Sequence, residues 1–295
     1  MQREKHTRSG RLFEAEFYPV FADGRRLPTR APKSKKSTAE QARYNQKKAI
    51  RNFVRMVNTN FFTGDIYMHP TFEPGTAPFT EEDAKREIAN SFRRHKRLRA
   101  SSLRRVIKAL SASPDDKRLL EKRKKLEEPF RYAYRIEVET FKRGARAGQQ
   151  RWHFHIFMTG GVERDDAESC WGLGACNADR YQPERFGPES AALYAAKGTQ
   201  GRLKFGYSKN LIRPDDSKVK DGQISAKGVE KMATQRVDDA AFWERRYKGY
   251  KFLKCYSRYN AYNGFWYVQV IMYKPESDGP LPEWSGGDTF DFEAA

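Results

Sequence analysis

The sequence has little cysteine and no long apolar run, and both absences limit what the protein can be. Its 295 residues include three cysteines, Cys170, Cys176 and Cys255. Three cysteines cannot form a disulfide framework, so we expect a reducing compartment, the cytoplasm. No segment approaches the roughly 18 consecutive apolar residues of a membrane span, and the opening MQREKHTRSGRL contains no apolar signal segment. We therefore expect a soluble, unexported protein without a membrane partner.

Two functional motifs are also missing. The sequence contains no G-x-x-x-x-G-K-[ST] segment, so it has no P-loop helicase of its own. A zinc site built from Cys170, Cys176 and two histidines is disfavoured, because five residues separate the cysteines. Paired cysteine ligands of structural zinc are usually separated by roughly two to four residues. We therefore do not expect the cysteines to hold a metal ion.

Positive charge is what the sequence has in excess. The formal net charge is +19, from 57 Lys and Arg residues against 38 Asp and Glu residues. Residues 1–60 contain 15 basic and 5 acidic residues, and residues 91–125 contain 14 basic and 3 acidic residues. Such segregated charge, with 14% aromatic residues, indicates a nucleic acid partner, whose phosphates bind Lys and Arg while unpaired bases stack on aromatic rings. A solvated basic surface is the alternative interpretation.

The order of patterns along the chain predicts one elaborated domain with appendages. Residues 1–37 are rich in basic residues and proline and are expected to form a mobile basic arm. A helix is expected over about residues 38–58, then a short strand within NFFTGDIYMHPTF, then a helix that begins at a Thr80 capping signal. A basic helical insertion is predicted at about residues 100–127. Residues 276–295 carry acidic and no basic residues, which predicts a disordered tail.

Two histidines, His153 and His155, flank one aromatic residue in the segment RWHFHIFMTG. The composition of this segment predicts a strand, and alternation along a strand directs both imidazoles to the same face of a sheet. Phe154 and, beyond the pair, Phe157 are expected on the packing face. The segment therefore separates a chemical face from a packing face.

A carboxylate is predicted beside the two histidines. The segment RYAYRIEVETF precedes them, and a Gly-containing turn, KRGARAGQQR, joins the two segments. This order predicts an antiparallel hairpin that places Glu137 or Glu139 next to the imidazoles. Two imidazoles and one carboxylate form a ligand set for a divalent metal ion.

The remaining segments complete an α+β pattern. PESAALYAAKGTQ predicts a short helix that ends at Gly198. The stretch from RLKFGYSKNLIRP to Gln235 is expected to be loop, and FWYVQVIMY to be a strand that pairs with KFLKCYSRY. Helices and hairpins in this order place the chain in the α+β class.

Together these segments resemble the HUH endonucleases, specifically the rolling-circle replication initiator (Rep) proteins of single-stranded-DNA phages and plasmids. The resemblance covers about residues 45–275. Its most specific part is His-x-His followed at a family-like distance by Tyr-x-x-Lys, here Tyr194 and Lys197. The other matching segments, in chain order, are NTNFFTGDIYMHP, EEDAKREIANSFRRHKR, RYAYRIE, CWGLG and FGYSKNLIRP.

One segment departs from the family pattern. The first family motif usually reads as an uninterrupted TLTY-like strand, whereas here it reads IYMHP. His69 is followed by Pro70 at the end of this strand. We expect His69 to have a surface role rather than to be an extra metal ligand.

The resemblance implies a fold and an activity. The fold would be an antiparallel sheet of about five strands with flanking helices, the ferredoxin- or RRM-like core of HUH nucleases, within residues 38–275. The activity would be that of a metal-dependent, site-specific single-strand DNA endonuclease and strand transferase that nicks a replication origin and initiates rolling-circle replication. The partners would be single-stranded or origin hairpin DNA and a host helicase and polymerase, in the cytoplasm of a bacterial host.

The resemblance also assigns the metal ligands. His153, His155 and Glu137 would hold Mg²⁺ or Mn²⁺ against the scissile phosphate. Glu137 aligns better than Glu139 with the acidic ligand of the family, but both side chains are expected on the same face of the strand.

The nucleophile and further DNA contacts follow from the same resemblance. Tyr194 would attack the scissile phosphate, which leaves a 5′-phosphotyrosine and a free 3′-OH. Lys197 lies at i+3 on the same helix and would favour the phenolate or assist the departing oxygen. Ser208, Lys209 and Asn210 resemble a family motif to which we assign DNA contact.

Three other functions stay open. A relaxase or single-tyrosine transposase shares the chemistry and differs in biological role. A non-haem iron oxygenase also uses two histidines and a carboxylate, but generally with a His-x-Asp/Glu pair, and it leaves the net charge unexplained. A non-catalytic nucleic-acid-binding protein explains the charge but gives no role to His-x-His and Tyr-x-x-Lys.

Overall fold

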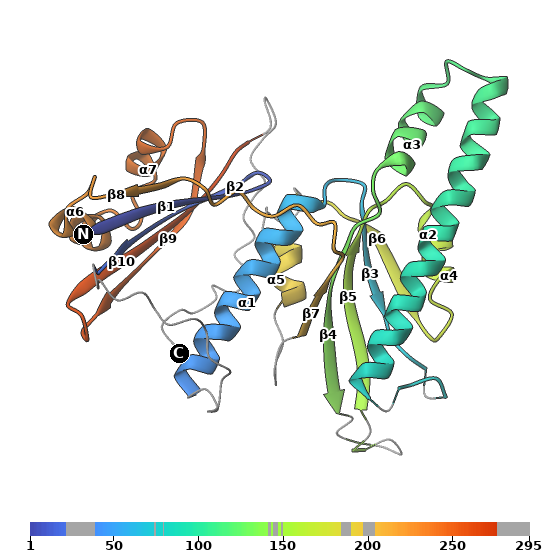
Figure 1. The fold of residues 1–295 in the computed structure, drawn as a ribbon, viewed down its shortest axis with the longest axis horizontal. Coiled ribbons are helices and arrows are strands. Elements are labelled where there is room, and N and C mark those ends of the chain that lie inside the picture. The colour runs from blue at the N-terminus through green and yellow to red at the C-terminus, as the bar shows by residue number, and fades with distance from the viewer. Residues whose placement is uncertain are drawn as a thin grey trace. The chain divides into compact units, whose positions relative to one another are not determined.

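In the part of the chain that the structure describes, the strands form two antiparallel sheets of five strands each (Figure 1). The computed structural model describes residues 1–21, 39–73, 75–78, 80–140, 143, 147–148, 150–183, 190–196 and 204–275. The chain divides into unit 1, Met1–Lys48 with Arg213–Ala295, and unit 2, Ala49–Ile212. The α+β class is therefore confirmed, but with two sheets in two units where the sequence predicted one sheet in one domain.

Unit 2 contains the segments predicted to carry the metal site. Its strand order is β6-β3-β5-β4-β7, so the strand with the two histidines is central. The strands are β3 (Ile66–Pro70), β4 (Tyr132–Thr140), β5 (Gln150–Met158), β6 (Cys176–Arg180) and β7 (Lys204–Tyr207). The helices are α1 (Ala39–Asn60), which begins in unit 1, α2 (Glu81–Ala112), α3 (Lys117–Glu127), α4 (Arg164–Ser169) and α5 (Ser190–Ala196).

Alternation along β5 separates two faces of this sheet. Phe154 and Ile156 are fully buried with Phe92 of α2 in one hydrophobic cluster. Phe157 lies on the opposite face, where its ring centroid is 4.4 Å from that of Tyr67 and 6.1 Å from that of Phe53 in α1. The prediction that Phe157 shares the packing face of Phe154 is wrong, because residues at odd positions of β5 lie on the face of the histidines.

The face of the sheet that carries Phe154 and Ile156 is covered by two helices, α2 and α3, which form a hairpin. The sequence predicted helices in this region. Thr80 caps α2, and its hydroxyl accepts a hydrogen bond from the Asp83 backbone N–H. Apolar residues at Ala84, Ile88 and Phe92 then face the sheet. The structure differs from the expectation of a separate insertion at about residues 100–127, because α2 continues without a break for 32 residues before α3 returns.

Unit 1 has the strand order β8-β1-β2-β10-β9. The predicted pairing of the last two strands is confirmed, and Val268 stands opposite Ser257. Helix α6 lies in a stretch expected to be loop, where Ser225 caps it and Val229 and Met232 are buried. The elements are β1 (Gln2–Ser9), β2 (Leu12–Pro19), β8 (Val219–Asp221), α6 (Ala226–Gln235), α7 (Ala240–Arg246), β9 (Lys251–Asn260) and β10 (Phe265–Tyr273).

The amino terminus differs from the predicted mobile arm. Strands β1 and β2 form an antiparallel hairpin within unit 1. Phe13, Ala15 and Phe17 alternate along β2 and are buried in a cluster with Trp243 of α7. Their period of two outweighs the basic composition of the segment. Residues 22–38 and the predicted tail at 276–295 lie outside the described residues.

No helix in the described part of the chain combines the length and the apolar composition needed to cross a membrane.

Candidate metal centre

Three histidines from two neighbouring strands meet on the α1 and α5 face of the sheet in unit 2. The nitrogen atoms that His69, His153 and His155 can offer to a metal lie within 4.8 Å of one another. Met68 of β3 pairs with Ile156 of β5, and Thr71 forms a bridge to His153, so the register places His69 opposite His155. The expectation of a surface role for His69 is therefore wrong, since the residue is half-buried within the cluster.

The cluster favours neutral imidazoles. Burial, followed by the neighbouring His155 and His153, lowers the pKa of His69 to about 4. Burial and the proximity of His155 likewise lower the pKa of His153 to about 4. Both rings are therefore neutral at pH 7, and neutral imidazole is the form that binds metal ions.

A carboxylate completes the set from strand β4. Glu137 stands opposite His153, and its Oε2 lies 3.3 Å from His155 Nε2. The hydrogen bond with His155, and then the charge of Arg135, lower the pKa of Glu137, so that it is ionised at neutral pH. Glu139 is two residues further along β4, and its side chain lies outside what the structure describes. Glu137 is thus the described carboxylate that contacts the cluster.

Tyr67 supports the imidazole of His155 from β3. Its Oη lies 3.0 Å from His155 Nδ1, which leaves Nε2 directed at Glu137. Burial raises the pKa of Tyr67, so its hydroxyl keeps its proton. A hydrogen-bonding group behind a ligand imidazole fixes the ring orientation and its tautomer.

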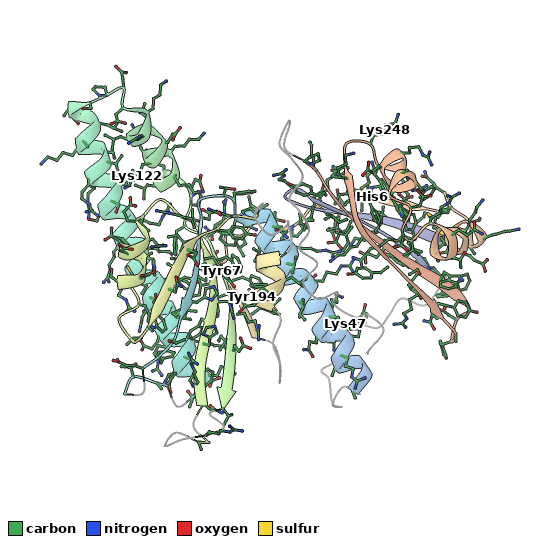
Figure 2. All side chains as sticks on the ribbon, turned by 180° about the vertical axis from the view of Figure 1, so that it is seen from behind. His6, Lys47, Tyr67, Lys122, Tyr194 and Lys248 are labelled. Carbon is green, nitrogen blue, oxygen red and sulfur yellow. The ribbon has the colours of Figure 1, made fainter. Side chains whose placement is uncertain are left out.

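Tyr194 lies at the open side of the cluster. Its ring is edge-on to that of His155, with centroids 5.8 Å apart, and its side chain is 63% exposed. Figure 2 shows Tyr194 on α5 close to Tyr67 on the sheet. The cluster therefore has a tyrosine that a large substrate can reach.

Two features bring α5 close to the sheet. Ala192, Ala195 and Ala196 are fully buried, and such small side chains permit close packing of the helix. Arg135 donates a hydrogen bond of 2.8 Å to the Ala195 carbonyl, and its other terminal nitrogen lies 3.0 Å from Glu137 Oε1. A single buried guanidinium therefore joins the carboxylate of β4 to the helix that carries the tyrosine.

Of the other predicted site residues, Ser208, Lys209 and Asn210 are not brought to this cluster. Lys197 lies outside the described residues. Ser208 is buried and exchanges hydrogen bonds with the Tyr132 backbone, and the Asn210 side chain donates to the Phe130 carbonyl. Tyr132 is five residues before the carboxylate of β4, or about 17 Å along the strand. Lys209, between them, is exposed.

Sequence reasoning missed Tyr67, His69 and Arg135. A signal existed for the first two, because positions 67 and 69 of a strand share one face. Arg135 stands opposite His155 in the predicted hairpin. Its link to α5 depends on tertiary packing that local patterns do not reveal.

Comparison of the chain with protein-family models, with curated proteins and with solved structures yields no match, so the functional argument rests on this geometry and on the residue patterns.

Proposed function

We propose that unit 2 is an HUH-type nuclease core that cleaves a single DNA strand by transferring it to Tyr194, and that the protein nicks a replication origin to start rolling-circle replication. One observation carries the proposal: an exposed tyrosine stands edge-on to a cluster of three imidazoles. A tyrosine with only a packing role would be buried and would not require imidazoles beside it. A site that only binds a metal ion would not require an exposed tyrosine.

The donor set fits a divalent transition-metal ion. Three imidazoles and one ionised carboxylate would hold it, from His69, His153, His155 and Glu137. Imidazole nitrogens suit transition metals, whereas Mg²⁺ takes mainly oxygen ligands, so Mn²⁺ is favoured over Mg²⁺ here. A bound cation would withdraw charge from the scissile phosphate and orient it for in-line attack.

The proposed reaction is a transesterification. The Tyr194 oxygen forms a bond to phosphorus, the bond from phosphorus to the 3′ oxygen breaks, and that oxygen leaves as a 3′-OH after taking a proton. The phenolic proton passes to solvent, which reaches this exposed side chain. Lys197, at i+3, is proposed to protonate the departing oxygen. The 5′-phosphotyrosine keeps the energy of the phosphodiester, so rejoining needs no nucleoside triphosphate.

Buried groups of the chain position the nucleophile in this proposal. Arg135 holds α5 through the Ala195 carbonyl and holds Glu137 through its carboxylate. The free 3′-OH would prime a host polymerase, and a host helicase would unwind the duplex because the sequence has no P-loop.

The test is formation of a covalent adduct. Protein, Mn²⁺ and 3′-labelled single strands that tile the DNA around the coding sequence are mixed and run on a denaturing gel. The wild type should give label that migrates with protein, and Tyr194→Phe should give none, because the change removes only the attacking oxygen.

Tyr262→Phe is the matched control, since Tyr262 is 98% exposed in unit 1 and should form adduct normally. An adduct that persists in Tyr194→Phe would refute the assignment of the nucleophile. Absence of any adduct in the wild type would refute strand transfer.

A further inference from the structure

Helix α2 presents a row of positive charges on the side away from the sheet. Arg93, Arg97, Arg104 and Lys108 are all exposed. At 3.6 residues per turn they fall within an arc of about 60°, opposite the buried positions of the helix. We call these four residues the basic stripe. It is about 22 Å long at a rise of about 1.5 Å per residue.

Within the described residues, the side-chain hydrogen bond that a member of the basic stripe makes, from Arg93 to Asn90 Oδ1, stays within α2. In the same part of the chain, none of the four members of the stripe forms an ion pair with an acidic side chain. Two other arginines of α2 behave differently: Arg94 donates to the Cys170 and Trp171 carbonyls, and Arg99 donates to carbonyls around α3. The helix thus separates structural arginines from exposed ones.

Acidic residues are absent along the stripe, so its charge is not compensated. The acidic residues of α2 lie in its first two turns, and the sequence has none from Ile88 to Pro114. Exposed Lys117, Arg118 and Lys124 on α3 add positive charge at the far end of the hairpin. Figure 1 shows the end of α2 and the adjoining α3 projecting beyond the sheet of unit 2, and Figure 2 labels Lys122 in this region.

We propose that the α2–α3 hairpin binds the phosphate backbone of double-stranded DNA. A row of cations on a rigid helix matches a rigid polyanion, and about 22 Å corresponds to six or seven base pairs at about 3.4 Å each. Single strands are bound in part by stacking of bases on aromatic side chains. The sequence from Arg93 to Pro129 contains no Phe, Tyr or Trp, so the hairpin has nothing on which unpaired bases could stack.

This inference deepens the proposed function and rests on it for its biological meaning: the hairpin would hold the duplex beside an origin while the single strand enters the site at Tyr194. Duplex binding can be measured independently of cleavage, because the basic stripe needs neither the metal ion nor the nucleophile to bind DNA. The two proposals can therefore fail independently.

The experiment measures binding of a 20-base-pair fluorescent duplex by anisotropy over a range of salt concentrations, in EDTA. The test variant is Arg97→Ala, Arg104→Ala and Lys108→Ala combined. The matched control is Lys227→Ala, Lys231→Ala and Lys248→Ala combined, which removes the same charge from exposed positions of unit 1.

We expect the test variant to flatten the slope of log affinity against log salt by about 0.9 for each phosphate that the protein no longer neutralises, or up to about 2.7. The control should keep the wild-type slope. Equal slopes in the two variants would overturn the proposal, as would a larger decrease of single-strand than of duplex affinity in the test variant. Adduct formation on a short single strand should be unchanged, and its absence in the wild type would instead refute the proposed function alone.

Discussion

The two units each build a polar cluster from the same residue types on the same kind of sheet, but the clusters differ in closure. In unit 1, Glu4 Oε1 accepts hydrogen bonds from His6 at 2.6 Å and Tyr247 at 2.8 Å, and Oε2 accepts from Arg246 at 2.7 Å. The Glu4 side chain is 3% exposed. One imidazole and one carboxylate satisfy each other there, and the described residues place no second imidazole beside them.

The cluster of unit 2 is open. Three imidazoles share one carboxylate, Glu137, and Tyr194 beside them is mostly exposed. Residue type alone therefore does not distinguish a structural network from the reactive site that we propose. Two properties distinguish the clusters: imidazoles outnumber carboxylates, and solvent reaches the tyrosine. The cluster of unit 2 has both properties.

The largest expected effect is the loss of cleavage when a ligand of the open cluster is removed. His153→Ala should lower the rate of adduct formation by more than about 100-fold, because changes even to groups behind metal ligands cost about 10- to 100-fold. His6→Ala, in the closed cluster, should leave the rate near that of the wild type. Single-turnover adduct kinetics with Mn²⁺ would measure both. Equal rates in the two variants would contradict the proposed functional difference between the two clusters.

Neutralising the carboxylates should separate stability from metal affinity. Glu4→Gln leaves Arg246 without its buried counter-charge and should lower the free energy of unfolding by about 3 kcal/mol. Glu137→Gln removes the counter-charge of Arg135, whose side chain is 2% exposed, and should cost a similar amount of about 3 kcal/mol, but only this change should also weaken Mn²⁺ binding. Urea denaturation and calorimetric Mn²⁺ titration would give the two quantities. The comparison fails if Glu4→Gln is the variant that loses Mn²⁺ affinity.

Tyr67→Phe tests the group that supports His155. Loss of the hydroxyl 3.0 Å from Nδ1 should weaken Mn²⁺ binding by about 10- to 100-fold, because the ring is no longer held. In unit 1, Tyr247→Phe should leave Mn²⁺ binding unchanged. Calorimetric titration would decide, and unchanged affinity in Tyr67→Phe would mean that the hydroxyl has no supporting role.

Acid should affect the two units in different pH ranges. The pKa of His69 and of His153 is about 4, below the ordinary 6.5, so the unfolded chain binds more protons and unit 2 loses stability as pH falls from 6.5 toward 4. Burial raises the pKa of Glu4, but hydrogen bonds from His6 and Tyr247 lower it to about 2, so its contribution is lost only from 4.5 toward 2.

Fluorine NMR of protein labelled with 5-fluorotryptophan would follow this difference, because buried Trp171 reports on unit 2 and buried Trp243 on unit 1. In metal-free protein, the Trp171 signal should change at the higher pH. A Trp243 signal that changes first would contradict the assigned pKa values.

Local patterns predicted the parts of the fold that depend on local physics. The β4–β5 hairpin formed with Glu137 opposite His153, as the strand alternation and the glycine-containing turn required. The cap at Thr80 began α2 where expected. Both depend on residues close in sequence, whose spacing alone determines which side chains meet.

What the sequence did not reveal depends on long-range pairing. His69 enters the cluster because β3 pairs with β5, almost 90 residues away along the chain, and a strand ending in proline gives no sign of its neighbour. Strand β1 was not predicted because its buried residues Glu4 and His6 are polar. Their burial is stabilised by hydrogen bonds to Glu4 from Arg246, the last residue of α7, and from Tyr247, which follows it.

The central claim is that the three imidazoles of unit 2 bind one metal ion, and Mn²⁺ binding followed by electron paramagnetic resonance tests it most directly. Free Mn²⁺ gives a sharp signal that is lost on binding, so titration yields stoichiometry and affinity. We predict one ion per wild-type chain, loss of this binding in His69→Ala and in His153→Ala, and wild-type binding in His6→Ala. If both single variants, His69→Ala and His153→Ala, bind Mn²⁺ as the wild type does, the account is contradicted.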